Sequence, residues 1–181
     1  MRKLKNTIIM VSLAWLAGCA TVVQMQYFTL DLRDSDPAAP PAAICVERIT
    51  LAEPLSRKDI LIQKTPTQIE YYATAQWAAG INDLVTQKLE SEFGEVSCDA
   101  NPYLLSGILY EFEQVDTENG AEAHAKFAAE LRAGRYEEPV LKKTYMERIP
   151  AVEPAPGAVV EALSRCVERI AAQIMADAAA L

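Results

Sequence analysis

The stretch from Glu122 to Arg132 reads EAHAKFAAELR, and it decides how the chain folds. Apolar residues stand at every odd position from Ala123 to Leu131, and mostly charged residues stand between them. Successive side chains of a β-strand point to opposite faces, so this period of two predicts a half-buried antiparallel strand. The chain is therefore expected to form a sheet with one face packed against a core.

Strand patterns continue on both sides of this stretch. Asn119 and Gly120 supply a turn signal between it and the preceding apolar run, and together with a following strand they predict a meander. A hairpin is expected earlier in the chain, around Pro66. The predicted strands are residues 44–51, 60–64, 68–72, 103–115, 122–132 and 140–149.

Two segments repeat apolar residues at steps of three and four, which predicts helices. The first runs from about Ala75 to Phe93, carries Trp77 on its apolar stripe, and ends before Gly94. The second runs from Ala158 to about Ala178. The order of elements predicts an α+β fold, in which two long helices pack on one face of a mainly antiparallel sheet within a single domain.

The amino terminus has the composition of an export signal. Arg2, Lys3 and Lys5 precede an apolar run that ends in the string LAGC, from Leu16 to Cys19. This run is well short of the roughly 20 apolar residues that cross a bilayer. The string resembles the lipobox of bacterial lipoproteins, which implies cleavage before Cys19, a diacylglycerol on its thiol and an N-acyl chain on its amine.

Two further features bear on location. The residue after Cys19 is Ala20, whereas an Asp there retains known lipoproteins at the inner membrane, so the resemblance implies the outer membrane, facing the periplasm. The chain carries 17 Lys and Arg against 25 Asp and Glu, a net charge of −8. This charge disfavours nucleic acids and anionic headgroups, so we expect attachment through the lipid anchor.

The sequence divides into three parts. Residues 1–18 are expected to be the lipoprotein signal peptide, and residues 44–181 one folded domain. Residues 19–43 are expected to contain the lipidated tether, a short strand from Tyr27 to Leu32 and a linker rich in Pro and Ala. The tether is short enough to keep the domain close to its membrane.

Few residues are candidates for catalysis or metal binding. His124 is the only histidine and is expected to be exposed on the polar side of its strand, and Glu111 and Glu113 are expected on a solvated face. Neither a hydrolase elbow, nor a zinc-binding His-Glu-x-x-His helix, nor a phosphate-binding loop occurs in the sequence. We therefore predict no enzyme, no catalytic residue, no metal site and no cofactor besides the lipid on Cys19.

Three cysteines remain after Cys19, in a compartment that permits disulfides. Cys166 lies beside the apolar stripe of the last helix, where a free thiol acts as a small hydrophobic group. A disulfide between Cys45 and Cys98 is therefore the pairing that we favour, and other pairings stay open.

The whole mature chain resembles the ABC-type transport auxiliary lipoproteins, the family of the paraquat-inducible protein C lipoproteins. The motifs that carry the resemblance are the lipobox, an aromatic-Thr-Leu string at Phe28–Leu30, the Pro/Ala linker, and Tyr71 and Tyr72 ahead of Trp77. Members often have an acidic residue and a proline after that tryptophan, and this chain has AAGI there instead. The helix entry is thus the part that the resemblance describes least well.

The resemblance implies a non-enzymatic adaptor for lipid transport between the inner and outer membranes. The implied partner is a membrane protein with mammalian-cell-entry domains, accompanied in some relatives by an ABC permease and ATPase, and self-association into a homo-oligomer is expected. Tyr27, Phe28 and Leu30 are the candidate partner surface, because this strand can pair with a partner's sheet edge. The alternatives are a lipoprotein that carries acyl chains itself, between sheet and helices, and an envelope hydrolase.

Overall fold

The computed structural model describes residues 24–32, 42–94, 96–100 and 102–181. Within these ranges the predicted strands and both predicted helices are present, with shifts at some ends. The elements are β1 (Gln26–Phe28), β2 (Ile44–Leu51), β3 (Asp59–Thr65), β4 (Gln68–Trp77), α2 (Ile81–Phe93), β5 (Tyr103–Thr117), β6 (Gly120–Arg132), β7 (Leu141–Pro150) and α3 (Pro156–Ala178).

The strands of the described residues form one mixed sheet in the order β1-β4-β3-β5-β6-β7, with β2 also beside β5. The β3–β4, β5–β6 and β6–β7 pairs are antiparallel. The β1–β4, β2–β5 and β3–β5 pairs are parallel. The fold class is α+β as predicted, but the expectation of a mainly antiparallel sheet is wrong.

The parallel pairs arise from the path of the chain. Strands β2 and β3 follow one another along the same edge of β5, with β2 beside its first half and β3 beside Gln114 and Val115. Strand β4 and helix α2 then form the crossover that returns the chain to β5 in the same direction. Alternation in a sequence reports which side chains are buried and carries no information on strand direction, so the pattern could not predict these pairs.

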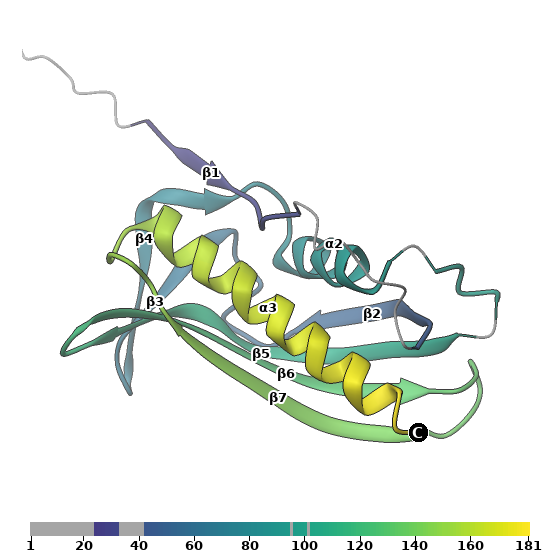
Figure 1. The fold of residues 1–181 in the computed structure, drawn as a ribbon. Helices are drawn as coiled ribbons and strands as arrows, with labels where there is room; N and C mark the ends of the chain where they lie inside the picture. Colours follow the sequence, from purple (N-terminus) through teal and green to yellow (C-terminus); the bar gives the residue numbers. More distant parts are fainter. Residues whose placement is uncertain (1–23, 33–41, 95, 101) are drawn as a thin grey trace, which may run out of the picture.

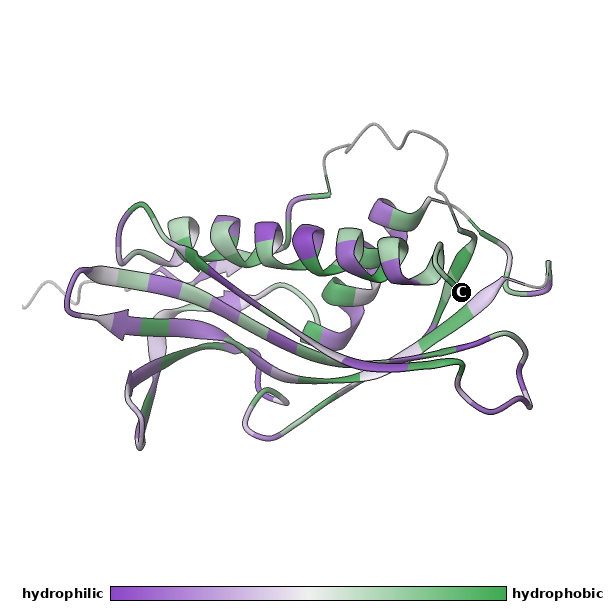
Figure 2. Ribbon diagram, turned by 60° about the horizontal axis from the view of Figure 1, so that its bottom comes forward, coloured by the Kyte–Doolittle hydropathy of each residue, from purple (hydrophilic) through white to green (hydrophobic). Residues whose placement is uncertain are grey.

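Both helices cover the same face of the sheet (Figure 1). Helix α3 lies over β6 and β7, and α2 packs beside it over β2. Hydrophilic and hydrophobic positions alternate along the long strands (Figure 2), as expected where one face is buried and the other faces solvent. The predicted inward positions of β6 are confirmed, since Ala123, Ala125, Phe127, Ala129 and Leu131 are all buried.

The first helix begins at Ile81, so the prediction that it begins near Ala75 is wrong. Ala75 and Trp77 belong to β4, where they are buried two residues apart. The positions of Ala75 and Trp77 fit the period of a strand as well as the stripe of a helix. The pairing of β4 with its neighbouring strands makes this segment a strand. Trp77 donates its backbone N–H to the Lys58 carbonyl at 2.7 Å and lies beside Phe28 of β1.

The segment from β1 to Leu32, which was predicted to lie between the tether and the linker, packs with the rest of the domain. Strand β1 pairs with the end of β4, and Leu30 is 1% exposed in the core. The backbone N–H of Asp31 donates to Ser164 Oγ of α3 at 3.0 Å. The fold therefore starts well before residue 44.

A buried lysine links the two helices. Lys88 of α2 is fully buried, and its Nζ lies 2.7 Å from Glu92 Oε1 and 2.8 Å from Glu168 Oε1 of α3. Burial lowers the pKa of Lys88, but hydrogen bonds to Glu168 and Glu92 outweigh that effect and hold the pKa above its ordinary value. The ammonium therefore stays charged and joins α2 to α3.

Replacement of this lysine should destabilise the protein, because the buried ion pair would lose its cation, which lies 2.7 Å from the Glu92 carboxylate. We expect Lys88→Met to lower the free energy of unfolding by about 3–5 kcal/mol in denaturant titrations. The exposed Lys142–Glu130 pair offers a control, since Lys142→Ala should cost about 0–1 kcal/mol. A double variant, Lys88→Met with Glu92→Leu, should regain much of the loss; equal effects of Lys88→Met and Lys142→Ala would contradict this account.

Candidate interaction surfaces

The cysteines occupy separate places in the fold. Cys19 lies outside the described residues, so its acylation stays a prediction. Cys45 of β2 and Cys98 of the α2–β5 connection form a disulfide with their Cα atoms 5.3 Å apart, the pairing favoured from the sequence. Cys166 is buried in α3, and burial raises the pKa of its thiol to about 12, so this group is an unreactive part of the core.

A groove of about 730 Å³ runs between the segment after β1 and the start of α3. Of the three candidate partner residues predicted from the sequence, Phe28 and Leu30 line this groove and Tyr27 does not. Tyr27 is 65% exposed, Phe28 is half-buried, and Leu30 is buried in the core and therefore unavailable to a partner. The groove lining is Phe28, Thr29, Leu30, Asp31, Leu32, Gly157, Val160, Glu161 and Ser164.

A second hollow, of about 530 Å³, lies on the face of the sheet that the helices leave open, across β2, β5, β6 and β7. Ile108, Tyr110 and Met146 are 38–45% exposed on this open face. Ion pairs stand among them, since Lys126 Nζ lies 3.5 Å from Glu111 Oε1. The open face thus combines apolar contact area with fixed charges.

No prediction from the sequence pointed to this open face. The outward positions of β5, β6 and β7 include small and apolar residues, which could have indicated a contact surface. Ile108 pairs with Ala128, and Ala128 pairs with Thr144. This surface could not be predicted from the alternation in β5, because a bulge between Leu109 and Glu111 shifts that alternation halfway along the strand.

His124 and Glu113 lie on the open face but are not solvated, so the expectation that they are exposed is wrong. Both are 8% exposed and face each other across the β5–β6 pair. His124 Nε2 lies 3.0 Å from Glu122 Oε2, and Arg148 is its register partner on β7. Burial, with the charge of Glu111 nearby, raises the pKa of Glu113 to about 7.

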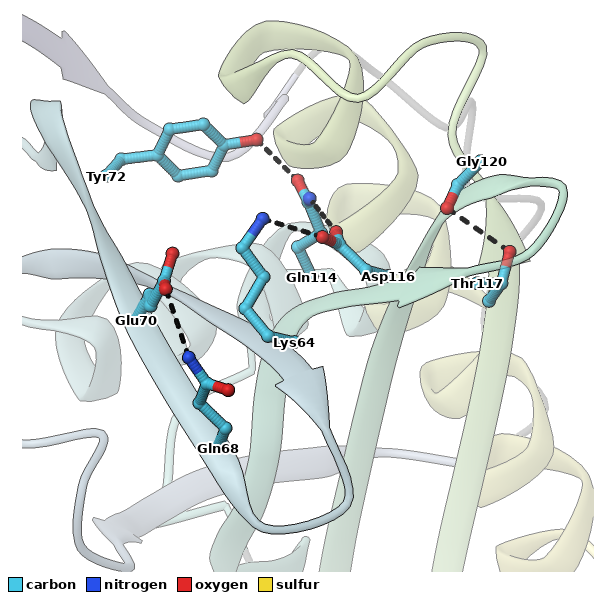
Figure 3. A network of polar contacts seen from close by, with 8 residues as sticks. All are labelled: Lys64, Gln68, Glu70, Tyr72, Gln114, Asp116, Thr117 and Gly120. Carbon is cyan, nitrogen blue, oxygen red and sulfur yellow. Dashed lines mark hydrogen bonds and ion pairs between the residues drawn. The ribbon is translucent and has the colours of Figure 1, made fainter.

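A network of polar side chains joins three strands at one end of the sheet (Figure 3). The Tyr72 hydroxyl of β4 donates to Gln114 Oε1 of β5, and Gln114 Nε2 donates to Asp116 Oδ1. Lys64 Nζ of β3 lies 2.7 Å from Asp116 Oδ2. Burial raises the pKa of Asp116, but hydrogen bonds to Lys64 and Gln114 outweigh burial and hold this pKa below its ordinary value. These side chains hydrogen-bond to one another, and the bonds hold the β3–β4 hairpin against β5.

The described residues contain no group of three or more His, Cys, Asp or Glu side chains placed to hold a metal ion. Nor is any helix among them long and apolar enough to span a bilayer.

Glu113 should make stability depend on pH. The folded protein holds this proton more tightly than the unfolded chain, whose carboxyl has a pKa near 4.5. Its contribution to stability is therefore full below about pH 4.5 and is lost as the pH rises through about 7. We expect the free energy of unfolding, measured by denaturant titration, to fall across this interval, and Glu113→Gln to reduce the fall.

Glu130→Gln removes a more exposed carboxyl from the same face and serves as the control. It should keep the pH dependence of the unchanged protein. A Glu113→Gln variant whose pH dependence matches that of Glu130→Gln would show that the burial of Glu113 does not have this effect.

Solved structures of similar fold exist. Protein XCC0632 from Xanthomonas campestris superposes with a TM-score of 0.69 at 18% identity, over 82% of this chain and 92% of that one. An uncharacterized protein of known structure superposes with a TM-score of 0.64 at 12% identity, over 85% of this chain and 98% of that one. At these identities the likeness shows the fold alone. Among curated protein sequences, none matches this chain.

The sequence itself identifies the family. Residues 28–175 match the family described as "ABC-type transport auxiliary lipoprotein component", a span that includes every helix and strand from β2 to β7 and most of α3. The resemblance inferred from the lipobox, the aromatic-Thr-Leu string and the tyrosines before Trp77 is thereby confirmed. The chain belongs to the ABC-type transport auxiliary lipoprotein family.

Proposed function

We propose that this lipoprotein is a non-enzymatic auxiliary subunit of a system that carries lipids between the inner and outer membranes. The observation that carries the proposal is the family match over residues 28–175. The proposed partner is a membrane protein with mammalian-cell-entry domains, with or without an ABC permease and ATPase. Self-association into a homo-oligomer is part of the same proposal.

The lipid anchor on Cys19 determines the membrane to which the protein is attached. Acylation of Cys19 attaches the chain to a membrane permanently, because each buried methylene contributes about 0.8 kcal/mol and several chains act together. Ala20 favours the outer membrane, so the domain faces the periplasm there.

The open face of the sheet is the proposed partner surface, in place of the strand-edge contact through Leu30. Its exposed apolar side chains, Ile108, Tyr110 and Met146, supply contact area, and a hollow of about 530 Å³ lies beside the first two. Lys126 and Glu111 provide charges that favour one partner orientation over another. The helices leave this face free (Figure 1).

A lipoprotein that binds acyl chains itself is the second candidate function. The groove beside α3 favours it, because its lining includes Phe28, Leu32 and Val160 and its volume is about 730 Å³. Lipid retained on the purified protein in native mass spectrometry, beyond the anchor, would support this function over the first.

One experiment tests the anchor and the partner together. The tagged protein is crosslinked in intact envelopes, purified from membranes and analysed by mass spectrometry. We expect an amino-terminal peptide that begins at an acylated Cys19, and co-purified components with mammalian-cell-entry domains or an ABC permease.

Two variants serve as controls. Cys19→Ser should leave the signal uncut and lose these partners, whereas Cys166→Ser, which changes a buried thiol, should keep both acylation and partners. Equal recovery in the outer-membrane fraction, with equal partners, for Cys19→Ser and the unchanged protein would contradict the anchor. An acylated protein that recovers no transport component would contradict the adaptor role.

A further inference from the structure

We infer that one end of the domain, formed by β1, the segment after it and the start of α3, rests on the bilayer leaflet that holds the anchor. Met25, Tyr27, Leu32 and Val152 are the side chains that meet the lipid. The inference rests on the proposed acylation of Cys19 and goes beyond it, because it assigns a lipid-contact surface to the folded domain.

The reach of the chain limits how the domain can lie. The seven residue steps from Cys19 to Gln26, where β1 begins, span at most about 25 Å in any conformation. The start of β1 therefore stays within that distance of the acylated cysteine. Phe28 lies beside Gly157, since a Cβ at Gly157 would be 3.9 Å from Phe28 Cε1, so the start of α3 is held near the membrane as well.

In the orientation we propose, the opposite end of the domain points away from the membrane. From Gly157 to Asp177, α3 rises about 30 Å, so the two ends of this helix are well separated. Asp177 accepts hydrogen bonds from Lys143 and Tyr145 of β7, which fixes this end of α3 near the β6–β7 turn. The β6–β7 turn lies at the end of the sheet remote from β1 (Figure 1). It contains Tyr136, which is 97% exposed.

The anchored end presents apolar side chains to solvent. Tyr27 is 65% exposed and Val152, in the turn before α3, is 86% exposed, while Met25 and Leu32 are 36% and 42% exposed. Tyrosine favours the membrane–water interface, where its ring is buried and its hydroxyl stays hydrated. Burial of this set against lipid adds to the hold of the anchor and fixes the domain's orientation.

The charges nearby indicate which lipid fits. Glu161 lines the groove that opens at this end, and Glu153 lies in the turn beside Val152. These carboxylates disfavour an anionic surface, so the contact suits zwitterionic headgroups and depends on apolar burial. The open face of the sheet is not used in this contact and stays free for a protein partner.

A fluorescent side chain tests the contact. The signal peptide carries Trp15, so the mature protein has one tryptophan, Trp77, which is 1% exposed and supplies a constant background. The acylated mature protein is inserted into vesicles of phosphatidylethanolamine and phosphatidylcholine with brominated acyl chains. In Tyr27→Trp we expect a blue-shifted emission and loss of most of the added fluorescence, because bromine quenches tryptophan at the interface.

Tyr136→Trp is the matched control, since it makes the same substitution at an exposed tyrosine of the far end. It should keep its emission in the same vesicles. Equal quenching of the two variants, or no quenching of either, would overturn the inference while leaving the anchor intact. A mass measurement that finds no acyl chain on Cys19 would instead refute the proposed function, and the inference with it.

Discussion

The close packing of α3 against the alanines of β6 is the contact on which the rest of the structure depends. Ala123, Ala125 and Ala129 are at most 3% exposed, and side chains this small let the helix lie near the strand. Cys166 fits into the same contact and donates its thiol to the Ala123 carbonyl at 3.6 Å. One face of the sheet is thereby closed by helices, and α2 is held beside α3 through Lys88.

This one-sided arrangement separates two surfaces. The open face carries the exposed side chains of Tyr110 and its neighbours, and Tyr27 is exposed on β1. In the function that we propose, the lipid on Cys19 and the end that carries Tyr27 hold the protein at a membrane, and the open face binds the transport partner. Its polar groups are engaged in holding strands and helices together, as Lys64 and Asp116 illustrate (Figure 3).

Much of the fold could be predicted from the sequence, because alternation and helical periodicity report burial directly. Strand β2 and the inward positions of β6 follow the prediction, and α3 begins two residues early. Strand direction, the place of Trp77 and the burial of Glu113 depend on neighbours far along the chain, so no local pattern contains them. Tyr27 is exposed, as its choice as a candidate partner residue requires, and that role stays a prediction. The open face could not be predicted, because a bulge in β5 shifts the alternation of that strand.

The central claim is that the open face binds the transport partner, and photocrosslinking in living envelopes tests it most directly. A photoreactive phenylalanine analogue replaces Tyr110 on the open face or Arg165 on the exposed side of α3, both in the acylated protein. The account predicts a crosslink from position 110 to a membrane protein of the transport system, and none from position 165. A crosslink to that protein from position 165 alone would contradict the account.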